Sequence, residues 1–181
     1  MRITGGLLKG RKIQVPAGVI RPSMDRMRES VFACLGDICG LSFLDIFTGS
    51  GIIALEAASR GAVYIEAVEQ DKLKRKTLLE NVSISPIRIN CRFMPAELYV
   101  KRAKTSFNII FLDPPFDYKH KWQLVSAISA SCLVTTNSRI LIHRPGEDDL
   151  TETIPNLEKK DSRKYGRSIV DFFVYNSDLV I

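Results

Sequence analysis

The sequence predicts a single α/β domain built on a doubly wound, mostly parallel sheet. From residue 42 onward, short runs of apolar and β-branched residues alternate with amphipathic stretches, and the runs are apolar almost throughout. Strands that are apolar on both faces are typical of a parallel sheet covered by helices on both sides. A chain of 181 residues is long enough to bury the core of one such domain.

Residues 1–40 are expected to form an extension in front of that domain, which occupies residues 41–181. Residues 2–4 and 12–15 can pair as a small hairpin, because the glycines between them permit tight turns. Residues 25–35 follow as a helix, since their apolar side chains recur at helical spacing on one side. The extension is therefore predicted as a hairpin followed by a helix.

The body of the chain is predicted as alternating strands and helices. The expected strands are residues 42–47, 63–69, 87–93, 107–113 and 138–143. The expected helices between them are residues 51–60, 71–82, 95–104 and 119–133. A polar stretch follows residue 150 and ends at a turn around Gly166. In residues 168–176, Ile169, Asp171, Phe173 and Tyr175 fall on one face and Val170, Phe172 and Val174 on the other, which predicts a final strand in an antiparallel hairpin at the edge of the sheet.

Composition excludes several classes of protein. Hydrophobic residues make up 45% of the chain and charged residues 25%, which is typical of a folded domain and not of a disordered chain. No apolar run approaches the roughly 18 residues that span a bilayer, and the first residues lack a signal-peptide core. We therefore expect a cytoplasmic protein with no membrane partner. The four cysteines form no C-x-x-C pair and only two histidines are present, so no metal site is expected.

The net charge of +6 is concentrated at the front of the chain. Residues 1–40 hold seven Lys and Arg against three Asp and Glu, whereas residues 41–154 hold fourteen against thirteen. A basic segment beside a near-neutral body suits a polyanionic partner, because contacts with phosphates release counterions. A solvated charged face explains the same distribution equally well. Charge alone therefore leaves both interpretations open.

A glycine-containing loop is expected to join the first strand to the next helix, at the edge where doubly wound folds bind nucleotides. Gly49 and Gly51 leave space for a ligand against the backbone, and the helix N-terminus offers free N–H groups. The loop matches G-x-G-x-x-G/A, and Glu69 follows about twenty residues later. An acid there binds ribose hydroxyls in a nicotinamide dinucleotide or in S-adenosylmethionine alike, so both cofactors stay open.

A second candidate site, Asp-Pro-Pro-Phe, follows the strand at residues 107–113. Two consecutive prolines hold the backbone stiffly, so Asp113 and the Pro114 carbonyl present acceptors in defined positions. These acceptors suit the two protons of an exocyclic amine, and Phe116 can stack on the ring that bears it. The amine lone pair is delocalised into its ring, and two fixed acceptors favour the geometry in which it attacks a methyl group.

Together these motifs resemble known methyltransferases. Residues 45–51, Asp-Ile-Phe-Thr-Gly-Ser-Gly, resemble the S-adenosylmethionine loop of class I methyltransferases, and residues 55–62 extend the match. Residues 113–116 resemble the (D/N)PP(F/Y) motif of enzymes that methylate planar amino groups. Residues 21–29, Arg-Pro-Ser-Met-Asp-Arg-Met-Arg-Glu, are similar to the RPTxDRVRE segment of RsmD-type methyltransferases, which modify guanine N2 in 16S ribosomal RNA. The likeness covers nearly the whole chain.

The resemblance implies a Rossmann-like methyltransferase fold, S-adenosylmethionine as cofactor, and ribosomal RNA or the small ribosomal subunit as partner. The residues at the target base would be Asp113, Pro114, Pro115 and Phe116. The residues around the cofactor would be Asp45, Phe47, Gly49, Ser50, Gly51, Glu69 and Asp113. The substrate entrance would be bordered by Arg21, Asp25, Arg26 and Arg28. Without the resemblance, an amphipathic helix with a solvated face explains this last group.

Three positions depart from the family pattern. The family has an acidic residue after the third strand to hold the adenine amine, where this chain has Met94-Pro95-Ala96. Adenine recognition is therefore left to backbone groups or to Glu97. The fifth strand ends in His143-Arg144 where an acidic residue is expected, and Thr48 replaces a common alanine.

The sequence therefore predicts an enzyme that transfers a methyl group from S-adenosylmethionine to guanine N2 in 16S ribosomal RNA. An amino methyltransferase acting on DNA adenine N6 or on a protein glutamine would use the same Asp-Pro-Pro-Phe chemistry. A non-enzymatic module that binds RNA or a nucleotide would retain the glycine loop without turnover. A nicotinamide enzyme is a weaker alternative, because it would leave Asp-Pro-Pro-Phe without a role.

Overall fold

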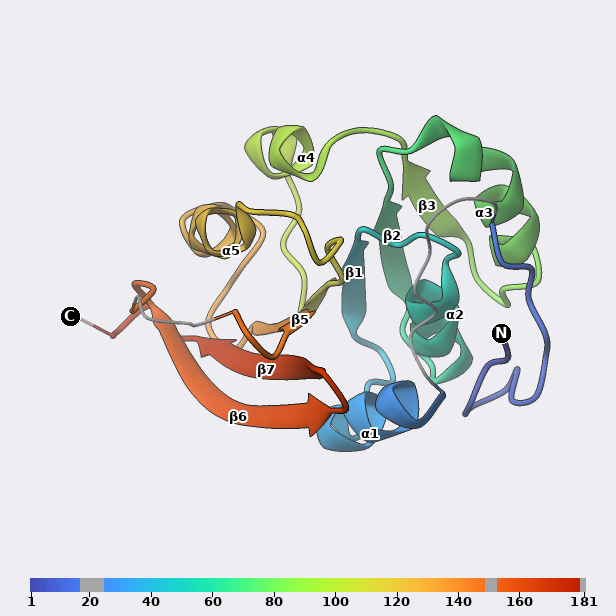
Figure 1. Cartoon of the computed structure of the whole chain (residues 1–181), viewed down its shortest axis with the longest axis horizontal. Coiled ribbons are helices and arrows are strands. Elements are labelled where there is room, and N and C mark those ends of the chain that lie inside the picture. The colour runs from blue at the N-terminus through green and yellow to red at the C-terminus, as the bar shows by residue number, and fades with distance from the viewer. Residues whose placement is uncertain (17–24, 149–152, 180–181) are drawn as a thin grey trace.

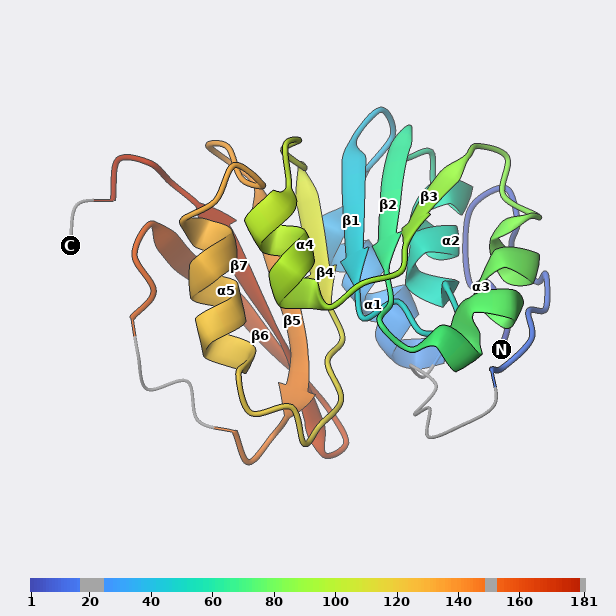
Figure 2. The ribbon, with the colours of Figure 1, turned by 90° about the horizontal axis from the view of Figure 1, so that it is seen from above.

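The computed structural model describes residues 1–16, 25–148 and 153–179 of the chain. These residues form one seven-stranded sheet with helices on both faces (Figures 1 and 2). The strands are β1 (Ser42–Ile46), β2 (Tyr64–Val68), β3 (Ile89–Arg92), β4 (Ile109–Leu112), β5 (Arg139–Pro145), β6 (Leu157–Tyr165) and β7 (Ser168–Tyr175). The helices are α1 (Asp25–Leu35), α2 (Ile52–Ser59), the short 3₁₀ turn η1 (Lys72–Lys74), α3 (Arg75–Val82), α4 (Ala96–Arg102) and α5 (Lys121–Ser129).

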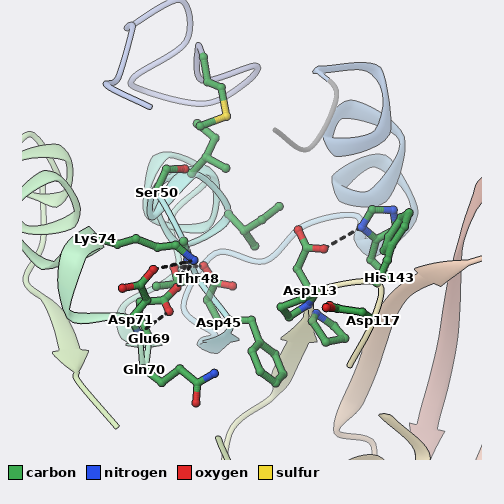
Figure 3. A pocket seen from close by; sticks show the side chains of 18 residues that line it. Asp45, Thr48, Ser50, Glu69, Gln70, Asp71, Lys74, Asp113, Asp117 and His143 are labelled. Carbon is green, nitrogen blue, oxygen red and sulfur yellow. Dashed lines mark hydrogen bonds and ion pairs between the residues drawn. The ribbon is translucent and has the colours of Figure 1, made fainter. Parts of the chain in front are cut away.

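The order of the strands confirms the predicted fold class. The sheet runs β3-β2-β1-β4-β5-β7-β6, with β1 to β5 parallel and both β7 and β6 antiparallel to their neighbours. The chain leaves β1 toward β2 on one side, and later returns to place β4 on its other side. Open α/β sheets bind ligands where the strand order reverses in this way. The carboxyl ends of β1, β2 and β4 carry the cavity drawn in Figure 3.

Two hydrophobic clusters cover the two faces of the sheet. One contains the apolar sides of α1 and α2, and the other contains those of α4 and α5. Strand β1 contributes to both, with Phe43 in the first cluster and Leu44 and Ile46 in the second. This two-sided burial explains why the parallel strands are apolar almost throughout.

Most predicted elements of the domain are present with shorter bounds, β5 extends to Pro145, and one strand is missing from the prediction. Strand β6 forms the expected hairpin with β7, but its residues were predicted only as a polar stretch. Of its nine residues only Leu157 is buried, so β6 is an edge strand without the apolar alternation that would reveal it. The helix expected at residues 71–82 begins instead as η1 and continues as α3.

The N-terminal segment packs directly on the domain. The predicted hairpin is reduced to one antiparallel bridge between Arg2 and Lys12, whereas helix α1 has the expected bounds. Ile3, Leu8 and Ile13 lie in the same hydrophobic cluster as α1 and α2. The division of the chain at residue 40 stays a prediction, because residues on both sides share this cluster. In the described part of the chain, no helix has the length and apolar character needed to cross a membrane.

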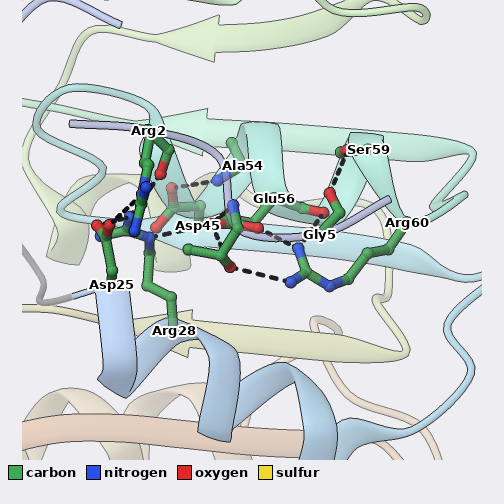
Figure 4. A network of polar contacts seen from close by, with 10 residues as sticks. Arg2, Gly5, Asp25, Arg28, Asp45, Ala54, Glu56, Ser59 and Arg60 are labelled. Carbon is green, nitrogen blue, oxygen red and sulfur yellow. Dashed lines mark hydrogen bonds and ion pairs between the residues drawn. The ribbon is translucent and has the colours of Figure 1, made fainter. Parts of the chain in front are cut away.

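A buried carboxylate joins the N-terminal segment, α1 and α2 (Figure 4). The side chain of Glu56 in α2 is fully buried. Its Oε1 accepts hydrogen bonds from the backbone N–H and the hydroxyl of Thr4, both at 2.8 Å, and from Arg28 Nε at 3.1 Å. Arg60, one turn along α2, pairs with the other oxygen. The groups that surround the carboxylate therefore come from the N-terminal segment, from α1 and from the end of α2.

Arg28 connects this carboxylate to the start of α1. Its side chain is fully buried, and its Nη2 donates to the Arg2 carbonyl and to Asp25 Oδ1, both at 2.7 Å. Arg2 Nε donates to the second oxygen of Asp25 at 2.8 Å. Removing one member of a buried ion-pair network leaves the remaining charge poorly compensated, which is strongly destabilising.

We expect the substitution Arg28→Leu to lower the free energy of unfolding by about 3 kcal/mol, because buried Glu56 loses a charged donor. Urea unfolding followed by circular dichroism measures this value. The matched control is Arg26→Leu, which removes the same charge from an exposed position of α1 and is expected to change stability by less than about 0.5 kcal/mol. Equal losses in the two variants would contradict a structural role of the network.

Candidate active site

A cavity of about 780 Å³ opens at the carboxyl ends of β1, β2 and β4 (Figure 3). It brings together nearly all residues of the two predicted sites. The predicted residues that line it are Asp45, Phe47, Gly49, Ser50, Glu69, Asp113, Pro114, Pro115 and Phe116. Glu69, Asp71 and Lys74 gather on one side of Asp45 in Figure 3, and Asp113 and His143 lie on the other.

The loop after β1 is tied to its neighbours by the backbone. Thr48 N–H donates to the Val68 carbonyl at the end of β2, at 3.0 Å, and Gly51 N–H donates back to the Thr48 carbonyl at 2.9 Å. Gly49 and Gly51 both have positive φ, as does Phe47 with φ of 64°. A positive φ strains a residue that has a Cβ atom. The hydrogen bonds of its neighbours Ile46 and Thr48 hold Phe47 in this conformation.

Gly51 serves the packing of a helix and is not among the residues that line the cavity. Its φ is 82°, and a Cβ atom at this position would lie 2.8 Å from Leu78 Cδ1 of α3. Its predicted place among the residues around the cofactor stays a prediction. The glycine allows α2 and α3 to approach each other behind the loop.

Asp45 is a fully buried carboxylate with one oxygen unpaired. Its Oδ2 accepts from the Thr48 hydroxyl at 2.5 Å and from Ala54 N–H at 3.1 Å. Its Oδ1 has no hydrogen-bond partner among the described residues. The threonine that departs from the family pattern thus binds the carboxylate directly. Buried polar atoms are nearly always paired, so an unpaired oxygen at a cavity indicates a place for a ligand donor.

The electrostatic surroundings of Asp45 favour a positively charged ligand. Burial raises the pKa of the Asp45 carboxyl to about 7. The nearby Asp113 and Glu69 carboxylates contribute to this rise, while the hydrogen bonds from Thr48 and Ala54 oppose it. A cation bound between these acids would relieve their mutual repulsion.

Glu69 follows β2 and closes the loop from the other side. Its Oε2 accepts from Gly49 N–H at 3.0 Å, and its Oε1 accepts from Asp71 N–H at 2.8 Å. Lys74 Nζ lies 3.6 Å from Glu69 Oε2 and 3.8 Å from Asp71 Oδ2. Glu69 is therefore oriented by backbone donors at the cavity wall, in the place where a sugar hydroxyl could meet it.

The Asp-Pro-Pro-Phe corner begins where β4 leaves the sheet. Asp113 N–H donates to the Ile46 carbonyl at 3.1 Å, so the corner starts beside the end of β1. Buried Lys121 of α5 donates to the Phe116 carbonyl at 2.8 Å and to the Tyr118 carbonyl at 2.7 Å, and it pairs with Asp148 at 2.9 Å. This lysine holds the far end of the corner, and no sequence pattern indicated it.

His143 of β5 is the main residue of the site that the sequence analysis did not assign. It lines the cavity, and its Nδ1 lies 2.8 Å from Asp113 Oδ1. Its ring meets the ring of Phe116 edge to face, with centroids 5.7 Å apart. The sequence showed only that a histidine stands where an acid was expected, and the neighbouring ends of β4 and β5 give that histidine its partners.

Tyr118 connects Glu97, a residue considered for adenine recognition, with Phe47 of the cavity wall. The Tyr118 hydroxyl donates to Glu97 Oε1 at 2.5 Å, and its ring packs against Phe47 with centroids 5.2 Å apart. Neither Met94 nor Glu97 is among the residues that line the cavity. Glu97 therefore supports an aromatic wall next to the cavity, and its role toward adenine stays unassigned.

The residues predicted at the substrate entrance have different environments in the structure. Arg21 lies outside the described residues. Arg26 is exposed on α1, and Asp25 pairs with Arg2 and Arg28. The fully buried position of Arg28 does not support its predicted role as an RNA contact, because its side chain is held by Glu56. In the described part of the chain no group of three or more His, Cys, Asp or Glu is placed to bind a metal ion.

Comparisons with known proteins place this architecture in a family. The family model described as conserved hypothetical protein 95 matches residues 1–174. Protein YlbH of Bacillus subtilis is 30% identical over 173 residues, which cover 92% of this chain and 94% of that protein. Ribosomal RNA small subunit methyltransferase D of Escherichia coli is 37% identical over 120 residues, 64% of this chain and 60% of that protein.

The same family likeness appears in three dimensions. The solved structure of protein yhhF from Escherichia coli covers 98% of this chain and 99% of its own, with a TM-score of 0.89 and 27% identity. The match extends over both hydrophobic clusters and the C-terminal hairpin. The chain belongs to the family described as conserved hypothetical protein 95, and its resemblance to RsmD-type methyltransferases is confirmed.

Proposed function

We propose that the protein transfers a methyl group from S-adenosylmethionine to the exocyclic N2 amine of a guanine in 16S ribosomal RNA. The observation that carries this proposal is that Asp45 and Glu69 share one cavity with the Asp113–Phe116 corner. Relatives in Escherichia coli and Haemophilus influenzae are named ribosomal RNA small subunit methyltransferase D, which supports the substrate class. Such an enzyme acts where ribosomal RNA is made, so we propose a cytoplasmic location.

The residues around Asp45 fit S-adenosylmethionine. The unpaired Asp45 Oδ1 is a buried acceptor suited to the ammonium group of the methionine part. Glu69 is oriented as an acceptor for ribose hydroxyls, and Gly49 leaves room for the ligand at the turn. When bound, S-adenosylmethionine supplies an electrophilic methyl group on a positively charged sulfur. The acidic lining matches that positive charge.

The corner after β4 would orient the target base. The Asp113 carboxylate and the Pro114 carbonyl accept the two amine hydrogens, and Phe116 stacks on the base. Both acceptors also stabilise the positive charge that develops on the amine nitrogen. A guanine in a loop suits this arrangement because its amine is exposed once the base leaves its stack.

Exposed basic side chains near the N-terminus would hold the surrounding RNA. Arg2, Lys9, Arg11 and Lys12 of the N-terminal segment are exposed, and so is Arg26 of α1. Contacts of this kind with phosphates position the RNA without reading its sequence. The buried side chain of Arg28 would contribute by fixing the N-terminal segment and α1 through its contacts with Arg2, Asp25 and Glu56.

A second candidate function is methylation of adenine N6. Two relatives named tRNA1(Val) (adenine(37)-N6)-methyltransferase match about two-fifths of this chain, at 40% and 34% identity. The same Asp-Pro-Pro-Phe acceptors suit an adenine amine. The relatives named ribosomal RNA small subunit methyltransferase D match a larger part of this chain, 64% and 78%, which favours ribosomal RNA over this candidate. The remaining alternatives, a protein glutamine or a non-enzymatic binding module, are decided by the same product analysis.

The product analysis uses isotopically labelled S-adenosylmethionine and small ribosomal subunits from cells that lack the protein. After incubation, the RNA is digested and its labelled nucleosides are identified by mass spectrometry. We expect the label in N2-methylguanosine. Label in N6-methyladenosine or in protein would replace the proposed substrate, and absence of all label would support a binding module.

We expect the substitution Asp113→Ala to lower kcat by about 10²- to 10³-fold, because the amine loses an acceptor that stabilises its developing charge. Steady-state methylation assays measure this loss, and calorimetric titration with S-adenosylhomocysteine checks that the cofactor site is intact. The matched control is Asp117→Ala, which removes an exposed carboxylate from the same corner. An Asp113→Ala variant as active as this control would contradict the proposed role.

Cofactor binding should depend on pH through Asp45, whose pKa is raised to about 7 by burial. Below this pH the carboxyl of the free protein is protonated, so binding of an ammonium group must release that proton. We expect the affinity for S-adenosylhomocysteine to rise about tenfold between pH 6 and pH 8. Calorimetry in buffers of different ionisation enthalpy measures the proton release.

The control for this experiment is Asp45→Asn, which removes the ionisation and keeps the shape of the side chain. We expect weaker binding by this variant and no proton release from this position. An affinity of the unmodified protein that stays constant between pH 6 and pH 8 would contradict an ionic contact at Asp45.

A further inference from the structure

We propose that His143 is a positioning residue that holds both the acceptor and the stacking ring of the Asp113–Phe116 corner. This inference rests on the proposed methyl transfer. It gives a role to His143, which stands at the end of β5 where the family pattern has an acidic residue. His143 reaches the corner from a separate strand. It therefore contacts two members of the corner, Asp113 and Phe116, from outside their own loop.

The register of the sheet brings His143 to Asp113. Strands β4 and β5 are parallel neighbours in which Leu112 pairs with Ile142. Asp113 follows Leu112 directly after β4, and His143 follows Ile142 within β5. Their side chains therefore meet at the edge of the cavity. His143 Nδ1 lies 2.8 Å from Asp113 Oδ1, with side-chain exposures of 11% and 23%. This short contact in a shielded position constrains the carboxylate more than an exposed contact would.

The surroundings of the ring indicate which nitrogen carries the proton. His143 Nε2 is buried and has no hydrogen-bond partner among the described residues. A proton on Nε2 would place a donor where no acceptor is available, whereas a proton on Nδ1 is donated to Asp113 Oδ1. The tautomer that fits the structure therefore donates from Nδ1, and the carboxylate of Asp113 accepts.

The same ring also touches the aromatic member of the corner. The rings of His143 and Phe116 meet at an interplanar angle of 71°, with centroids 5.7 Å apart. Edge-to-face pairs with this spacing are favourable and directional. The imidazole thus limits the rotation of Asp113 through a hydrogen bond and the rotation of Phe116 through a ring contact.

A packing role alone does not account for a histidine at this position. An apolar side chain of similar size would fill the space on β5 without burying an unpaired nitrogen, which costs free energy. A carboxylate has about four acceptor sites, and the hydrogen bond from His143 uses one of them. The contact therefore orients Asp113 and leaves it able to accept an amine hydrogen.

Two substitutions separate the hydrogen bond from the ring contact. His143→Asn keeps an N–H donor near the position of Nδ1 and removes the ring, whereas His143→Phe keeps a ring and removes the donor. Misplacement of a reacting group by about 1 Å can cost about 100-fold in rate. We expect His143→Phe to lower kcat by at least tenfold with little change in KM for RNA. We expect His143→Asn to keep kcat within about threefold and to raise KM for RNA several-fold.

The controls distinguish positioning from folding and from failure of the proposed function. The affinity for S-adenosylhomocysteine and the melting temperature are measured for both variants, and the unmodified protein is assayed on the same RNA. If both variants lose kcat equally, or if His143→Phe is as active as the unmodified protein, His143 does not position Asp113. If the unmodified protein forms no N2-methylguanosine, the proposed function fails independently of the variants.

A spectroscopic measurement tests the hydrogen bond without activity. The chain has two histidines, His120 and His143, so ¹⁵N-labelled imidazole signals are assigned by their absence in His143→Asn. We expect His143 to carry its proton on Nδ1, and we expect the signal to change in Asp113→Ala. A proton on Nε2 in the unmodified protein, or a His143 signal that is the same in Asp113→Ala, would overturn the inference.

Discussion

One backbone hydrogen bond underlies the arrangement of the site. Asp113 N–H donates to the Ile46 carbonyl at 3.1 Å, one residue after Leu112, which pairs with Ile46 at the end of the β1–β4 ladder. The two loops then separate, because β1 continues into the helix α2 while β4 continues into the Asp-Pro-Pro-Phe corner. A reversal of strand order requires this separation. The cavity between the loops is thus a consequence of topology, and its side chains determine what it binds.

Acidic side chains at close range shape the chemistry of this cavity. Asp45, Glu69 and Asp113 come from the ends of three different strands, and the last two carboxylates raise the pKa of the first. Such mutual repulsion destabilises the empty site and favours a cationic ligand. Among the described residues, the two buried side-chain atoms without a partner are Asp45 Oδ1 and His143 Nε2. Both belong to residues that line this cavity, one on each side of it.

The basic N-terminal segment is joined to the site by a buried charge. Glu56 accepts from Thr4, Arg28 and Arg60, and it lies on the helix that follows the glycine loop. The contacts of Glu56 therefore fix the exposed basic side chains relative to the cavity. Arg28 illustrates how a motif residue can act as scaffold. Its neighbour Arg26 has the same charge and faces solvent, so only one of the two is available to RNA.

The fold class and both loops of the site were predictable from sequence patterns. The apolar strands, the glycines after β1 and the prolines after β4 are features of short stretches of sequence. They can therefore be recognised without knowledge of which segments pack together. The sequence also indicated the family, because the motifs at residues 45–51 and 113–116 are contiguous. The edge strand β6 escaped prediction because both of its faces meet solvent, so it has no alternation to detect.

The packing of distant segments determines which charged residues are exposed and which lie in the core. Arg26 and Arg28 differ by two positions on one helix, and their opposite environments follow from the packing of α1 against α2. The contact between His143 and Asp113 joins residues 30 positions apart, and it arises from the pairing of β4 with β5. Local patterns record the preferences of each segment, whereas these contacts depend on which segments become neighbours when the chain folds.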